Sequence, residues 1–111
     1  MHPEVLKSKQ KKTMVPDSLQ GILWSKSVKN LDLERDKVYI IHQILSYGNL
    51  RQIRWLFKTY GLREIREIFL KYPKKIYATP VFYFVKNFIL NLKNKKLSSS
   101  IYVKSSIRTL K

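Results

Sequence analysis

The sequence predicts an all-α fold: a small bundle of about four short helices with flexible basic arms at both ends. Three observations lead to this fold class. Apolar residues recur at intervals of three and four between residues 32 and 92. The segments with this period are short and are separated by Gly or Pro. A chain of 111 residues that is 44% apolar can bury one core but not two.

Three regions follow from the same patterns. Residues 1–18 contain two prolines and the run KSKQKK without periodicity, which predicts a flexible basic arm. Residues 19–93 form the predicted helical domain, and its short apolar patch GILW, residues 21–24, is expected to attach the start of the domain to the core. Residues 94–111 are rich in Lys and Ser and predict a basic tail, in which residues 101–103 could form a short strand.

The first two helices are bounded by capping residues. Asp32 is the predicted N-cap of the first helix, and Gly48 is expected to end it in a left-handed conformation. Asn49 followed by Gln52 resembles a capping box for the second helix, which Gly61 ends. Each helix carries one apolar stripe: Leu33, Ile40, Ile41, Ile44 and Leu45 on the first, and Leu50, Ile53, Phe57 and Tyr60 on the second.

The third predicted helix begins at Leu62 and stops before Pro73, because a residue that precedes proline avoids the helical region. Its expected core side comprises Leu62, Ile65, Ile68, Phe69 and Tyr72. Thr79 and Pro80 supply an N-cap and a first-turn proline for the fourth helix. The apolar stretch over residues 80–92 is shorter than the roughly 20 residues that span a bilayer, which predicts a buried helix, with attachment to a membrane surface as the alternative.

The charge balance favours acidic or polyanionic partners. The chain has 23 Lys and Arg against 7 Asp and Glu, a formal charge of +16. Five of the seven acids lie between Asp32 and Glu67, and ten basic residues but no acid follow Glu67. The absence of cysteine excludes disulfides, thiolate metal sites and a cysteine nucleophile. It also fits a cytoplasmic protein, as does a first segment without the apolar core of a signal peptide.

The candidate binding site lies on the second helix. Arg51, Arg54 and Lys58 fall within about 60° of one another on a helical wheel, opposite the apolar stripe, and Trp55 projects beside them. An exposed Trp could anchor a protein interface or stack on a nucleobase. The alternatives are that the three cations form a solvated face and that Trp55 packs beneath the N-terminal segment or the fourth helix.

Successive short helices also invite a helix-turn-helix interpretation, with the third helix in the major groove. The outer face of that helix argues against it. Arg63, Glu67 and Lys71 are neighbours of opposite charge, and Glu64 lies beside them, so two carboxylates would meet the phosphates. Any nucleic acid would therefore contact the second helix and the arms, mainly through phosphates.

No catalytic constellation is evident. His2 and His42 have no neighbouring acids or cysteines at metal-ligand spacing, so neither is expected to bind metal. His42 falls at the margin of the polar face of the first helix. Glu64 and Glu67 are interpreted as members of surface ion pairs, and three glycines leave no room for a phosphate-binding loop. We therefore expect a protein that is not an enzyme and needs no cofactor or metal.

Ordered motifs between Leu23 and Phe84 resemble a small bacterial domain family of unknown function. In chain order the motifs are Leu23-Trp24, Leu31-Asp32, Tyr47-Gly48, Trp55-Leu56, Tyr60-Gly61, Ile65-Arg66-Glu67 and Phe82-Tyr83-Phe84. Domains of that family are often encoded beside AbiEii-type nucleotidyltransferase toxins. The resemblance implies an antitoxin or accessory role in a toxin-antitoxin or phage-defence pair, and it assigns no catalytic or binding residue.

Three functional hypotheses remain open at this point. The first is a non-enzymatic, antitoxin-like protein that pairs with a toxin-like nucleotidyltransferase. The second is a DNA- or RNA-binding protein, for example an autoregulator, that contacts mainly phosphates. In the third, the charge serves only solubility or adhesion to membrane surfaces. The sequence does not define the oligomeric state.

Overall fold

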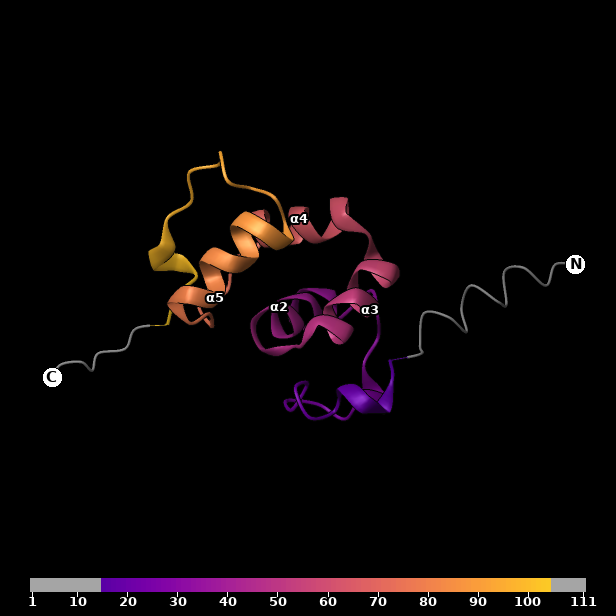
Figure 1. The fold of residues 1–111 in the computed structure, drawn as a ribbon. Coiled ribbons are helices and arrows are strands. Elements are labelled where there is room, and N and C mark those ends of the chain that lie inside the picture. Colours follow the sequence, from indigo (N-terminus) through magenta and orange to yellow (C-terminus); the bar gives the residue numbers. More distant parts are fainter. Residues whose placement is uncertain (1–14, 105–111) are drawn as a thin grey trace, which may run out of the picture.

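The computed structural model describes residues 15–104, which contain four α-helices and confirm the predicted all-α fold. The helices are α2 (Lys37–Tyr47), α3 (Leu50–Tyr60), α4 (Leu62–Lys71) and α5 (Thr79–Phe84) (Figure 1). A π-helix, Val85–Ile89, continues α5. Of the predicted basic arms, positions 1–14 and 105–111 lie outside the described residues, whereas positions 15–18 and 94–104 are described.

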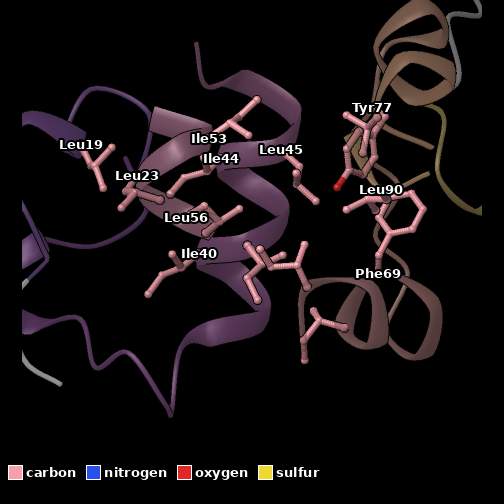
Figure 2. Close-up of a cluster of buried hydrophobic side chains, with 14 of the residues drawn as sticks. Leu19, Leu23, Ile40, Ile44, Leu45, Ile53, Leu56, Phe69, Tyr77 and Leu90 are labelled. Atoms are coloured by element: carbon pink, nitrogen blue, oxygen red, sulfur yellow. The ribbon is translucent and has the colours of Figure 1, made fainter. Parts of the chain in front are cut away.

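The core is built around α2, which packs against both α3 and α4. Its side chains Ile40, Ile41, Ile44 and Leu45 are almost completely buried, as their predicted stripe requires. Figure 2 shows Leu19 and Leu23 of the N-terminal segment on one side of α2, with Phe69, Tyr77 and Leu90 on the other. Burying one such side chain contributes roughly 1.5–3 kcal/mol, so α2 holds the two sides of the domain together. The predicted attachment of residues 21–24 to the core is made by Leu23.

The start of α2 differs from the prediction. The helix begins at Lys37, so Asp32 is not its N-cap. The Oδ1 atom of Asp32 instead accepts 2.8 Å hydrogen bonds from the backbone N–H groups of Glu34 and Arg35. Asp32 therefore closes the turn that precedes α2. The prediction was wrong because an Asp side chain accepts backbone hydrogen bonds in turns as well as at helix starts, and the sequence alone does not distinguish the two.

Gly48, which follows α2, does not have the predicted left-handed conformation. Gly48 has a φ of −79°, which is not left-handed. A Cβ atom at this position would lie 2.7 Å from the carbonyl oxygen of Ile44. Glycine is needed here because the backbone of residue 48 approaches the last turn of α2 closely. At the end of α3, in contrast, Gly61 has a φ of +84°, which favours glycine for its conformation.

The predicted capping box at the start of α3 is confirmed. Asn49 Oδ1 accepts from the Gln52 N–H at 2.9 Å, and Gln52 Oε1 accepts from the Asn49 N–H at 2.8 Å. The predicted apolar stripe is partly wrong. Ile53 and Leu56 are the buried residues of α3, whereas Leu50 is 68% exposed.

The third predicted helix matches its bounds, whereas the fourth is shorter than predicted: α5 ends at Phe84, and the π-helix that continues it ends at Ile89. The core face of α4 consists of Ile65, Ile68 and Phe69, and the helix ends at Lys71, before Pro73. Thr79 is the first residue of α5 rather than its N-cap, and Pro80 lies in the first turn as predicted. Within residues 15–104, no helix combines the length and the apolar composition that crossing a membrane requires.

Residues beyond position 93 also pack against the helices. Tyr77 N–H donates to Tyr102 O, and Lys104 N–H donates to Tyr77 O, both at 2.9 Å. These bonds form one isolated parallel bridge between Tyr77 and Val103, where the sequence allowed a short strand. The buried Tyr102 ring stacks on Phe69 with centroids 4.5 Å apart, and its hydroxyl donates to Phe69 O at 2.7 Å. The packed structure therefore extends to this bridge.

Candidate functional site

The exposed face of α3 carries the three cations that the sequence singles out. Arg51, Arg54 and Lys58 are all solvent-exposed. Five ion pairs occur within residues 15–104, and none of them includes these three side chains. Their positive charge is therefore not neutralised by neighbouring acids, and it is directed to solvent. We call Arg51, Arg54 and Lys58 the basic ridge.

Trp55 is partly buried and packs against the core. Beside it lies an open pocket of about 420 Å³, lined by Pro16, Ser18, Leu19, Asn49, Arg51, Gln52 and Trp55. Trp55 and residues of the N-terminal segment thus line the same pocket, and part of the Trp55 side chain is buried against the core. The remaining exposed part lies next to Arg51, so the ridge retains an aromatic neighbour but not a freely projecting one.

The acids lie elsewhere, mostly around the start of α2. Lys37 Nζ contacts Glu34 Oε2 at 2.9 Å and Glu64 Oε2 at 2.6 Å, and these two carboxylates raise the pKa of Lys37. Hydrogen bonding by Arg35 is the main reason why the pKa of Asp36 is lowered to about 2. The carboxylates at this end are therefore already paired with cations.

The acids on the outer face of α4 are also paired with cations. Glu67 pairs with Lys71 at 3.0 Å, and Glu64 pairs with Lys37 of α2. The predicted ion-pair roles of Glu64 and Glu67 are confirmed. The sequence did not identify Lys37 as a partner, because that contact joins two different helices.

An apolar groove lies between the start of α3 and α5, and the sequence analysis did not predict it. It has a volume of about 310 Å³ and is lined by Leu45, Ser46, Gly48, Asn49, Leu50, Ile53, Val81, Phe84 and Val85. Leu50 is 68% exposed, and Phe84 is 47% exposed. Phe88, 69% exposed, lies 5.9 Å from Phe84 between ring centroids. The sequence signal for this groove is the stretch over residues 80–92, in which apolar residues occupy more positions than one core-facing side of a helix needs.

His42 is completely buried rather than at the margin of a polar face. Its Nε2 atom lies 2.7 Å from the carbonyl oxygen of Tyr72, which can only accept, so Nε2 carries the proton. Nδ1, 2.7 Å from the Tyr77 hydroxyl, must then accept. Burial lowers the pKa of His42 to about 4, which keeps the ring neutral at pH 7. This satisfied pair of hydrogen bonds indicates a structural role.

Metal binding requires a grouping of suitable side chains. Across positions 15–104, no three His, Cys, Asp or Glu side chains are grouped so that they could hold a metal ion. The surface instead offers two features that suit binding: the basic ridge and the adjacent apolar groove. Neither arrangement includes a nucleophile paired with a base.

Comparison with known proteins finds a similarity over part of the chain only. No curated protein matches the chain, and no solved structure matches it. The matched segment runs from residue 19 to residue 69 and thus includes α2, α3, the basic ridge and most of α4. Over these residues the chain is similar to a family of unknown function, DUF6922.

Proposed function

We propose that this chain is a non-enzymatic binding protein that pairs with a toxin-like nucleotidyltransferase, as an antitoxin or accessory protein. The observation that carries the proposal is the position of an exposed apolar groove directly beside an unpaired basic ridge. Leu50, at the rim of the groove, precedes Arg51 of the ridge in the chain. The resemblance of residues 23–84 to domains encoded beside such enzymes supports this class of partner.

The combination of surfaces favours a protein partner over nucleic acid alone. Protein interfaces have a well-packed apolar centre that is surrounded by a polar rim. Leu50, Phe84 and Phe88 supply apolar surface of that kind, and the ridge supplies the charge. A surface that only tracks phosphates gains little from three exposed apolar side chains.

Where a nucleotidyltransferase gene lies beside the gene for this chain, co-expression of the two proteins tests the proposal. The two proteins are expected to co-purify, and the chain is expected to relieve growth arrest caused by its partner. Replacing Arg51, Arg54 and Lys58 by Ala should weaken both effects. Replacing Lys29, Lys95 and Lys96 by Ala is the matched control, because it removes the same charge at exposed positions away from α3. Failure to co-purify together with failure to relieve the arrest would refute the role.

Nucleic-acid binding is the second candidate, favoured by the formal charge of +16 and the unpaired ridge. Each phosphate contact releases counterions, so affinity should fall steeply between roughly 50 and 200 mM salt. Affinity that is unchanged over this range, or no binding to mixed-sequence DNA and RNA, rejects this candidate. If neither assay responds to the triple Ala variant, the charge serves only solubility or surface adhesion.

A further inference from the structure

The groove between α3 and α5 leaves apolar side chains without partners in the described chain. Its floor is formed by residues of the core, including Leu45 and Ile53, while Leu50 and Phe84 stand at its rim. Phe88 extends the apolar surface along the same helix, four residues after Phe84. A contiguous apolar surface of this kind typically marks an interaction site.

The side of the groove formed by Val81, Phe84 and Val85 lies where α5 changes to a π-helix. After Phe84 the α-helix changes to the π-helix Val85–Ile89, which is closed by a 2.8 Å bond from Leu90 N–H to Val85 O. Arg66 of α4 fixes the end of this segment, because its Nε donates to Leu90 O at 2.8 Å. π-turns are rare and occur frequently at functional sites. Here the segment carries Phe88 on the exposed surface.

The surroundings of the groove are positive. Arg54 follows Leu50 by four residues on α3, so the two side chains are neighbours on the helix surface. Beside the apolar surface that Phe88 adds, Lys93 Nζ lies 6.0 Å from the centre of the Phe88 ring. None of the residues that line the groove is acidic. An occupant must therefore offer apolar side chains and negative charge together.

We propose that this groove binds one face of an acidic amphipathic helix from a partner protein. A helix places apolar side chains on one stripe and can carry Asp and Glu on both flanks, facing Arg54 and Lys93. This inference rests on the proposed role as a protein-binding partner, and it names the element of the partner that docks.

Charge excludes the other occupants. A second copy of the chain also carries +16, so two copies repel each other. The chain segments outside the structure are basic as well. Residues 1–14 contain four Lys and one acid, and residues 105–111 contain Arg108 and Lys111 without any acid. Only a foreign acidic segment complements both the apolar floor and the cationic rim.

Selection from a library of random peptides about four helical turns long tests the groove without knowledge of the natural partner. The full chain is immobilised, and the selected peptides are measured by fluorescence anisotropy. We expect net acidic peptides with apolar residues spaced by three and four. Leu50→Glu should weaken their binding about tenfold or more, because it places a carboxylate at the apolar rim.

Leu62→Glu is the matched control. It makes the same change at the first residue of α4, outside the groove, where Leu62 is 39% exposed. Unchanged binding to this variant supports the proposal. Selection of no peptide or of neutral or basic peptides, or equal loss in both variants, overturns it. If the nucleotidyltransferase co-purifies with the Leu50→Glu chain as well as with the original, the proposed function stands and the groove proposal fails. If acidic peptides bind the groove but the nucleotidyltransferase does not co-purify, the groove proposal stands and the proposed function fails.

Discussion

His42 is the buried group whose protonation the fold opposes most directly. Its Nδ1 must accept from the Tyr77 hydroxyl, and its Nε2–H already donates to Tyr72 O. A second proton on the ring would force the Tyr77 hydroxyl to accept from Nδ1–H and would leave the proton of that hydroxyl without its acceptor. The Tyr77 side chain is itself completely buried, so its hydroxyl has no access to water as a replacement partner.

Stability should therefore fall as the pH drops from about 6.5 to 4. The pKa of His42 is about 4 in the fold, against the ordinary value of 6.5 for histidine, so the unfolded chain binds more protons within this window. The contribution is fully present above pH 6.5 and amounts to roughly 3 kcal/mol.

Urea unfolding measured at several pH values checks this dependence of stability on pH. In His42→Gln, which cannot titrate, the slope between pH 6.5 and 4 should disappear. The loss that arises from Asp36, whose pKa is about 2, lies at lower pH. A wild-type slope retained by His42→Gln would contradict the assignment.

At the scale of single elements, the capping box of α3 is the feature that sequence predicts best. Replacing Asn49 by Ala removes the acceptor of the Gln52 N–H and should cost about 1 kcal/mol. Thermal unfolding followed by circular dichroism measures this loss. Asn49→Ser keeps a capping oxygen and should retain most of the stability. Equal destabilisation by both variants would show that the Asn49 side chain matters for packing and not for capping.

The π-helix at the end of α5 depends on α4. Arg66→Ala removes the donor to Leu90 O and leaves a carbonyl of a buried residue without that bond, so we expect a loss of about 1–3 kcal/mol. Arg66→Lys cannot donate with the same planar geometry and should recover only part of it. Arg63→Ala is the control on the same helix, because Arg63 is exposed and makes no side-chain hydrogen bond within residues 15–104. Denaturant unfolding distinguishes the three variants.

The range of each interaction along the chain explains what could be predicted from sequence. The box at Asn49 and Gln52 and the stop at Gly61 are encoded within four residues, and both are confirmed. The His42–Tyr77 bond spans 35 positions, and Lys37–Glu64 spans 27. Such pairs depend on how helices pack, which periodicity does not define. Leu50 was assigned to the core for the same reason: its spacing fits a stripe, but the packing of α3 centres on Leu56. The basic ridge was found because exposed cations on one helix need no tertiary partner.

For the whole molecule, the excess of positive charge is a cost that salt should relieve. The 23 basic residues face 7 acids, and the acids that form ion pairs are gathered around α2 and α4. Repulsion among the remaining cations opposes the compact state, and its screening length is about 10 Å at 0.1 M salt. The melting temperature should therefore rise when sodium chloride is increased from about 20 to 300 mM, although surface ion pairs alone would predict a slight fall. The Arg51, Arg54, Lys58 triple Ala variant carries less charge and should show a smaller rise, measured by differential scanning fluorimetry.

A melting temperature that falls with salt in both proteins would mean that the ion pairs at the start of α2 outweigh the repulsion. The basic ridge would then be maintained at no cost to folding.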